Sequence, residues 1–380
     1  MDRLRNIGRG RPRPDRVAIG SSAHGPLFVF VVWAAFLFCV VYLASAPVNA
    51  PLPWDRALAN WDTGWYLSIV EGGYQRELAA QSNVAFFPAY PLLVRWISAL
   101  GPDPVAAGVG LSLACFLAAL FVLRRLLRAR LEPRTASNAL LLTAFWPFSF
   151  FFALAYTESL FLLLAAAAFL FAEEDRWWPA ALCAGIASGT RVVGVFLAVG
   201  VVLAFFQKDE WRPTPRYLLK SAGLGIVGAS GLVAFMAYLW RHTGSALAFL
   251  EVQRFWPHRG EGAAGLGRIP EVLANHPASS YEYAALLVFL IPLALFLGLS
   301  LFVLLRRDAA WGAFSLLTLI APVPTGSIAS TNRYVLVLFP CFAALAELLK
   351  ERAAVVIAAS AGLLGLFAYH YVFHAGIFIG

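Results

Sequence analysis

LFVFVVWAAFLFCVVYLASA, residues 27–46, contains no charged side chain. A helix needs about 20 apolar residues of this kind to cross the hydrocarbon core of a bilayer. Comparable runs recur along the chain, which has 380 residues and is 61% hydrophobic and only 13% charged. A soluble domain of this size carries more polar surface than that. The sequence therefore predicts an all-α, polytopic membrane protein.

The residues that flank this first run have features of a secretory signal peptide. RLRNIGRGRPRPDR, residues 3–16, is basic, and PVNA, residues 47–50, offers small residues for cleavage. However, Pro51 would follow the cut, and the run is long enough to span. We expect an uncleaved first helix after a disordered basic tail, 1–26, that lies near anionic lipid headgroups. Residues 27–380 are expected to form a single transmembrane domain.

The apolar runs predict about eleven membrane segments. The ambiguous stretch is 179–206, which is either one tilted helix or two short helices hinged near Ser188-Gly189-Thr190-Arg191. A single crossing would place Lys208 and the cations after it outside the cytoplasm, against the positive-inside tendency. We therefore expect the hinge. The segments are expected at 27–46, 105–123, 135–153, 157–172, 179–190, 193–206, 221–240, 285–305, 311–324, 334–349 and 353–374.

The distribution of cations predicts the orientation of the chain in the cell membrane. With the hinge, most of the 29 Lys and Arg residues fall in loops on the same side as the N-terminus. Basic loops stay on the cytoplasmic side, so we expect a cytoplasmic N-terminus. The net charge of +8 then reflects this membrane asymmetry and not nucleic-acid binding. Two long connections, 47–104 and 241–284, fall on the extracytoplasmic side, where amphipathic helices are expected along the membrane interface.

The first of these connections contains WDTGWYLSIVEGGY, residues 61–74. On a helix over 61–71, Asp62, Trp65 and Tyr66 share one face, and Gly72-Gly73 then ends the helix. A carboxylate in partly dry surroundings holds a proton more strongly than one in water, and can then serve as a general base. Alternatively, Asp62 is only a helix N-terminal acid and the aromatics are interface anchors. From these residues alone both interpretations stay open.

A set of motifs resembles the glycosylphosphatidylinositol second-mannose transferase family (PIG-V type). The resemblance runs in order from residue 54 to about residue 345. Its two most specific motifs lie in the first long connection. The matching residues are Trp61-Asp62, Tyr66-Leu67, Ile69, Gly73-Tyr74, Ala85-Phe86-Phe87-Pro88-Ala89-Tyr90-Pro91, Tyr156-Thr157-Glu158-Ser159-Leu160-Phe161, Thr190-Arg191-Val192-Val193-Gly194, Asn332-Arg333-Tyr334 and Phe339-Pro340.

The resemblance implies a GT-C fold and an inverting glycosyltransferase that uses a polyprenyl-phosphate-linked sugar as donor. In such enzymes an acid of the first outside loop acts as base, and Asp62 is the matching position. Mannose is the sugar that the family suggests, with glucose or a pentose as the nearest rival. Eukaryotic members have longer lumenal loops, and the composition of this chain looks bacterial. The acceptor, which could be a lipid, a glycan or a protein, therefore stays open.

The leaving polyprenyl phosphate needs cationic partners, and few cations are expected outside the cytoplasm. We expect Arg191 and Arg333 to bind this phosphate, with Arg254 and Arg259 as weaker candidates. Alternatively, Arg191 pairs with a lipid headgroup or with Glu158. Glu158 is then either a second acid of the cavity or only the partner of an arginine.

The remaining candidates are other acids and aromatic residues. Asp55 is a rival for the role of base, and Glu71, on the opposite helix face from Asp62, is expected to be solvated. The sequence contains no metal-binding motif, and neither a metal nor a cofactor is expected. Aromatic residues are expected to line the site, or else to pack at the interface: Trp61, Trp65, Tyr66, Phe86, Phe87, Tyr90 and Tyr334.

Two other classes of function compete with the enzyme. A transporter or lipid flippase predicts internal repeats and charged or broken helices at mid-membrane, whereas the polar residues here gather at the outer face. A non-catalytic membrane partner of a glycosylation complex predicts that Asp62→Asn leaves cellular glycans unchanged.

Overall fold

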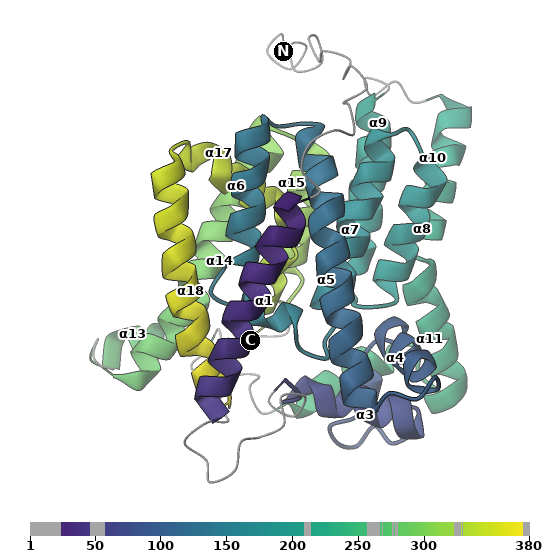
Figure 1. Cartoon of the computed structure of the whole chain (residues 1–380). Helices are drawn as coiled ribbons and strands as arrows, with labels where there is room; N and C mark the ends of the chain where they lie inside the picture. The colour runs from purple at the N-terminus through teal and green to yellow at the C-terminus, as the bar shows by residue number, and fades with distance from the viewer. Residues whose placement is uncertain are drawn as a thin grey trace.

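The computed structural model describes residues 24–45, 58–208, 214–256, 267, 269–275, 277, 280–322, 328 and 330–374. Within these ranges the chain forms helices joined by turns and loops, without a strand, as the sequence predicts (Figure 1). The basic tail as far as residue 23, the rival acid Asp55 and the cation Arg259 lie outside the described residues.

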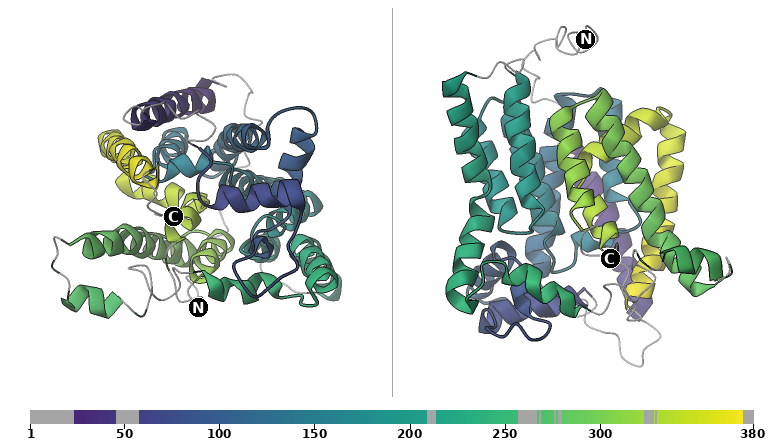
Figure 2. Two further views of the ribbon diagram at one scale, coloured as in Figure 1. Left: turned by 90° about the horizontal axis from the view of Figure 1, so that it is seen from below. Right: turned by 180° about the vertical axis from the view of Figure 1, so that it is seen from behind.

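Most helices run up and down side by side in one bundle (Figures 1 and 2). The N-terminal helix α1 packs against α5, α6 and α18. Helices α5, α7, α8 and α9 follow one another across the bundle, and α14, α15 and α17 complete it. Their bounds are α1 His24–Ser45, α5 Pro104–Arg128, α6 Pro133–Ala144, α7 Glu158–Glu173, α8 Trp177–Ser188, α9 Gly194–Lys208, α10 Pro215–Gly228, α11 Ser230–Thr243, α14 Tyr281–Arg306, α15 Ala309–Ile320, α16 Thr331–Leu336, α17 Phe339–Leu349 and α18 Arg352–His374.

Four of the described helices are long and apolar enough to cross a membrane: α1, α5, α14 and α18. The pair α10 and α11 becomes a fifth if it counts as one bent span. Three shorter apolar helices are α9, α15 and α17. These helices indicate a multi-pass membrane protein, while the count of eleven segments stays a prediction because many of the expected spans are short helices.

Several helices begin where the sequence supplies a cap. Asp103 Oδ1 accepts a hydrogen bond from the backbone N–H of Val105 at 2.9 Å, and Pro104 follows at the first helical position of α5. Asp308 caps α15 in the same way through the N–H of Trp311 at 2.9 Å. Such side chains satisfy the backbone donors that a helix leaves unpaired at its N-terminus.

Three expected spans are interrupted. The expected span 135–153 stops at Ala144 and resumes as the short 3-10 helix η3 (Ser149–Phe152), with Pro147 between them. The expected span 334–349 divides into α16 and α17, with Pro340 at the start of α17. Proline cannot donate a backbone hydrogen bond and ends or begins helices at such places. The expected span 221–240 bends by 52° between α10 and α11.

The hinge expected within 179–206 is present, because α8 ends at Ser188 and α9 begins at Gly194. Close backbone contact holds this region against α11. A Cβ atom added to Gly231 would lie 2.3 Å from the carbonyl oxygen of Gly185, so glycine is required there. The carbonyl oxygen of Gly189 also accepts a hydrogen bond from the N–H of Ala89 at 2.9 Å. The hinge thus supports the first long connection.

The two long connections form short helices at one end of the bundle. The first contains α3 (Asp62–Gly72), η2 (Asn83–Ala85) and α4 (Ala89–Ser98). The second contains α12 (Ala248–Glu251), η4 (Val252–Phe255) and α13 (Ile269–Asn275). Helix α3 ends as predicted, with Gly73 as its C-cap at a φ of 75°. In Figure 1, α3 and α4 lie at the lower end of the bundle, and α9 is labelled at the upper end.

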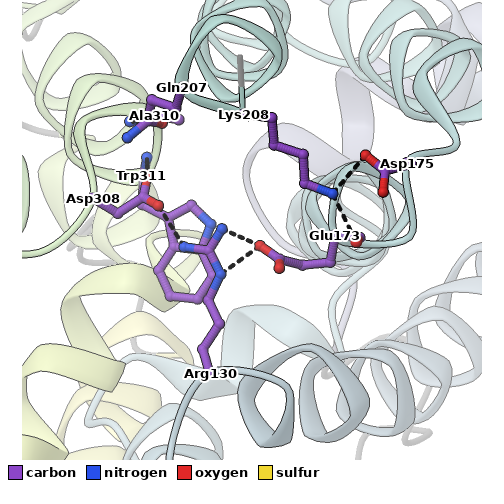
Figure 3. A network of polar contacts seen from close by, with 8 residues as sticks. All are labelled: Arg130, Glu173, Asp175, Gln207, Lys208, Asp308, Ala310 and Trp311. Atoms are coloured by element: carbon purple, nitrogen blue, oxygen red, sulfur yellow. Dashed lines mark hydrogen bonds and ion pairs between the residues drawn. The ribbon is translucent and has the colours of Figure 1, made fainter. Parts of the chain in front are cut away.

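At the end of the bundle opposite to α3 and α4, a polar network connects the loops between helices (Figure 3). Arg130 Nε donates to Glu173 Oε1 at 2.5 Å, and Arg130 Nη1 donates to Asp308 Oδ2 at 2.5 Å. The guanidinium also lies 4.3 Å from the ring centroid of Trp311. Burial alone would lower the pKa of Arg130, but the carboxylates of Asp308 and Glu173 raise it above its ordinary value. Lys208 extends the network to Asp175 at 2.6 Å.

Replacing Arg130 should destabilise the folded protein. Arg130→Ala leaves two carboxylates in a largely buried place without their cation, and breaking a buried ion pair costs about 3 kcal/mol or more. Thermal unfolding of the purified protein in lipid nanodiscs measures the loss. Arg125→Ala is the matched control, because Arg125 is 71% exposed in its pair with Glu174, and exposed pairs contribute about 0–1 kcal/mol. Equal transition temperatures for the two variants would contradict this role of Arg130.

Candidate active site

Asp62 is the first residue of α3, and a buried tyrosine holds the turn that precedes it. The hydroxyl of Tyr156 donates to the carbonyl oxygen of Asn60 at 2.9 Å and accepts from the N–H of Asp62 at 2.9 Å. Between these residues, Trp61 has a φ of 56° and a ψ of −112°. Such a backbone is costly for a residue other than glycine and tends to occur at functional sites. This turn fixes the backbone position of Asp62, from which its carboxylate extends.

Arg333, from α16, joins Asp62 to Glu158, the first residue of α7. Its Nη1 donates to Asp62 Oδ2, and its Nε donates to Glu158 Oε1 at 2.5 Å. The guanidinium carbon lies 4.5 Å from the ring centroid of Tyr156. The side chain of Arg333 is only 6% exposed, so it is held on several sides. Three segments that are far apart in the sequence thus meet at one guanidinium.

Arg191 binds the same oxygen of Glu158 from the hinge between α8 and α9. Its Nη1 donates to Glu158 Oε1 at 2.9 Å, and its guanidinium carbon lies 4.7 Å from the ring centroid of Tyr334. Pairing of Arg191 with Glu158 was one of the alternatives that the sequence left open, and the structure contains this pair. Arg191 and Arg333 are therefore neighbours on one carboxylate oxygen.

Two carboxylates and two guanidiniums make up this cluster, which we call the acid–arginine cluster: Asp62, Glu158, Arg191 and Arg333. The side chain of Glu158 is 0% exposed, whereas that of Asp62 is 18% exposed. The second oxygen of Glu158, Oε2, is buried and has no hydrogen-bond partner among the described residues. With both acids ionised, the four charges balance. The arrangement can therefore accept an anion if a guanidinium turns toward it.

Aromatic rings surround the cluster on the side of α3. The ring of Tyr66 lies 5.4 Å from that of Tyr90 and 6.2 Å from that of Tyr156, between ring centroids. Burial raises the pKa of Tyr66 to about 12, although the nearby positive charge of Arg333 opposes this rise. The phenol of Tyr66 is therefore protonated at neutral pH and does not act as a base there.

Trp65 lies on the same helix and shares Phe86 with Tyr66 as a neighbouring ring. It stacks on Phe86, with 6.0 Å between ring centroids, and lies 5.6 Å from Trp256 of the second long connection. Trp256 also lies 6.1 Å from Phe86. The three rings join the two long connections beside the helix that carries Asp62.

Other candidates lie elsewhere or have structural partners. Phe87 packs against Phe235 and Phe249 in a separate apolar cluster. Tyr90 is fully buried, and its hydroxyl donates to the carbonyl oxygen of Gly108 at 2.8 Å. Arg254 is exposed, with its guanidinium carbon 4.8 Å from the ring centroid of Phe255. The structure thus brings Asp62, Glu158, Arg191, Arg333, Tyr66 and Tyr334 together and places Phe87 apart from them.

Two residues that shape the site, Tyr156 and Asn60, have roles that the sequence does not predict. Tyr156 belongs to a motif that the sequence singles out, and the only signal for its role is its place two residues before Glu158. Asn60 contributes only a backbone carbonyl, which no side-chain pattern predicts. No group of three or more His, Cys, Asp or Glu residues in the described part of the chain could hold a metal ion.

Comparison with known proteins matches the part of the chain that contains α3, α7 and the hinge. Residues 35–208 match the family model of the mannosyltransferases (PIG-V). The resemblance predicted from the sequence motifs is therefore confirmed for this part of the chain. The human GPI alpha-1,6-mannosyltransferase 2 is 31% identical over 157 residues, which are 38% of this chain and 31% of the human protein. The match thus spans about a third of that relative.

Two crystal structures of the Archaeoglobus fulgidus oligosaccharyltransferase resemble this chain more weakly, with lower sequence identity. One, tethered with an acceptor peptide, has a TM-score of 0.47 and 13% identity and covers 93% of this chain and 55% of the archaeal chain. The other, in complex with Zn and sulfate, has a TM-score of 0.46 and 14% identity, covering 91% and 53%. The chain spans about half the length of that protein, and scores of this size do not establish a shared fold.

The hydroxyl of Tyr156 should be required to hold the turn before Asp62. Tyr156→Phe removes the acceptor for the N–H of Asp62, so amide hydrogen exchange over residues 60–64 should become faster. Tyr66→Phe is the matched control, because it removes a buried hydroxyl from the same group of rings without breaking those two hydrogen bonds. Mass spectrometry of peptic fragments reports the exchange, and equal protection of this segment in both variants would show that Tyr156 does not hold it.

Proposed function

We propose that the chain is an inverting membrane glycosyltransferase of the GT-C type. It moves a hexose, with mannose as our first choice, from a polyprenyl-phosphate donor to a lipid, glycan or protein acceptor. The observation that carries this proposal is the acid–arginine cluster, in which a partly exposed carboxylate lies beside two guanidiniums. The match of residues 35–208 to a mannosyltransferase family supports the choice of sugar transfer over transport or a non-catalytic role.

In this mechanism, Asp62 is the general base. Its carboxylate takes the proton of an acceptor hydroxyl while the acceptor oxygen attacks C1 of the donor sugar. The bond between C1 and the phosphate oxygen breaks, and its electron pair stays with the phosphate. The new bond forms on the opposite face of the sugar, so the configuration at C1 inverts. Asp62 can reach an incoming hydroxyl because its side chain is 18% exposed, whereas Glu158 is fully buried.

Arg191 and Arg333 bind the phosphate and stabilise the charge that it gains as it leaves. A guanidinium suits this role because it carries a permanent charge and offers several N–H donors in a planar fork. Both arginines share one oxygen of Glu158, so they are held side by side. Two neighbouring guanidiniums stabilise a developing phosphate charge more than water does in a largely buried site.

The reaction takes place at the extracytoplasmic surface in this proposal. The acid–arginine cluster involves α3, from the connection that the positive-inside tendency assigns to the outside. The Arg130 network joins the ends of α7 and α9 to the start of α15, and these helix ends lie at the other end of the bundle (Figure 1). Aromatic residues such as Trp96, which is 69% exposed on α4, suit the headgroup region next to the site. A membrane-embedded donor would reach the cluster from this region.

An in vitro transfer assay tests the function. Purified protein in nanodiscs is incubated with short polyprenyl-phosphate mannose, and with the corresponding glucose and pentose donors, beside a panel of lipid, glycan and peptide acceptors. Asp62→Asn should lower transfer by about 10²–10⁴-fold, the usual contribution of a general base. Glu71→Gln, which changes an exposed acid of the same helix, should retain the activity. The proposal fails if wild-type protein transfers no sugar from any of these donors.

The charge of the cluster predicts how one substitution affects phosphate binding. Glu158→Gln removes one negative charge next to both arginines but keeps an oxygen that can accept their hydrogen bonds, so farnesyl monophosphate should bind more tightly than it does to the wild type. A role for Glu158 in folding alone predicts weaker binding instead. Equilibrium binding of radiolabelled farnesyl monophosphate separates the two outcomes, with Glu71→Gln again as the control.

A further inference from the structure

We propose that Arg333 exchanges partners during the reaction: it leaves the carboxylate of Asp62 for the donor phosphate, and only then is Asp62 available as the base. This inference rests on the proposed function and deepens it. It makes the donor the first substrate to bind, and it assigns to Glu158 the role of a positioning residue that holds Arg333 before and after the exchange.

The contacts of Arg333 allow this exchange because they use different nitrogen atoms. Nη1 binds Asp62, whereas Nε binds Glu158 at 2.5 Å. A small rotation of the side chain can therefore move Nη1 from one anion to another while the contact through Nε persists. The side chain is 6% exposed and lies over the ring of Tyr156, so it does not need to swing into solvent.

Glu158 is suited to be the fixed point of this rotation. Its side chain is 0% exposed, and its Oε1 accepts from both Arg333 and Arg191. Arg191 comes from the hinge at Ser188 to Gly194, which is packed closely against α11 through Gly189 and Gly231. The anchor is therefore part of the packed bundle, whereas Asp62 lies on the short helix α3 at its end (Figure 1).

The charges of the cluster favour the exchange when the donor arrives. Without a donor, two acids and two guanidiniums balance. The phosphodiester of the donor adds one negative charge, which draws a guanidinium toward it in a place where little water screens the attraction. Of the two arginines in the cluster, Arg333 is the one that can respond without losing Glu158, because it bridges the two acids.

After the exchange, Asp62 has no cation on its Oδ2 oxygen. That oxygen can then accept a hydrogen bond from the acceptor hydroxyl and take its proton as the new glycosidic bond forms. The departing phosphate keeps the electron pair of the broken bond and remains on Arg191 and Arg333. When the prenyl phosphate leaves the site, Arg333 returns to Asp62 and the original pairing is restored.

Chemical labelling of Asp62 tests the exchange without requiring sugar transfer. Full-length protein in nanodiscs is treated with a water-soluble carbodiimide and an amine, and the modification of each carboxylate is measured by mass spectrometry. Farnesyl monophosphate at saturation should raise the labelling of Asp62 several-fold, while exposed Glu71 keeps its rate. Arg333→Gln should show the high rate with or without the phosphate. Inorganic phosphate tests whether the prenyl chain is needed for this effect.

Labelling of Asp62 that stays constant or falls on addition of farnesyl monophosphate would overturn the inference, and this arm needs only the wild-type protein. The outcome is separate from that of the transfer assay. Active transfer with unchanged labelling supports the proposed enzymatic activity and refutes the exchange. Raised labelling without transfer from any donor supports the exchange as a response to prenyl phosphate and refutes the proposed function.

Discussion

The candidate site depends on the contact of Arg333 with Glu158, a guanidinium and a fully buried carboxylate 2.5 Å apart. A buried charge is costly unless it is paired and hydrogen-bonded. Glu158 meets this requirement through two arginines from different parts of the chain. Because Arg333 also reaches Asp62, the same contact sets where the candidate base lies relative to both cations. Without this contact, Arg333 and Asp62 would lose their fixed positions relative to Glu158 and Arg191.

The interruptions of the helices give these charges their places. Arg191 follows the end of α8, Glu158 begins α7, and Arg333 lies on α16 just before the break between α16 and α17. Short or broken helices in a membrane are tolerated where they face protein or a polar cavity. The breaks thus bring polar side chains to one end of an otherwise apolar bundle, while the Arg130 network holds the other end (Figures 1 and 3).

Local features of the fold were predictable from the sequence, whereas contacts between distant segments were not. Gly72-Gly73 predicted the end of α3, and the charge pattern predicted the break near Arg191. The bend between α10 and α11 was missed because no proline marks it. The pairing of Arg191 with Glu158 was foreseen as one alternative. The position of Arg333 between two acids was not, because Arg333 is separated by 175 positions in the sequence from Glu158 and by 271 positions from Asp62. No feature of the sequence predicted the unusual backbone conformation of Trp61.

In the proposed reaction, Asp62 and the two arginines act on opposite sides of the same sugar–phosphate bond. A cryo-electron microscopy structure of the protein with a non-hydrolysable mannosyl phosphonate on a farnesyl chain tests it most directly. We expect the phosphonate within hydrogen-bond distance of Arg191 and Arg333, and the carboxylate of Asp62 facing C1 from the opposite side of the sugar. A phosphonate bound away from both arginines, or a sugar out of reach of Asp62, would contradict the claim.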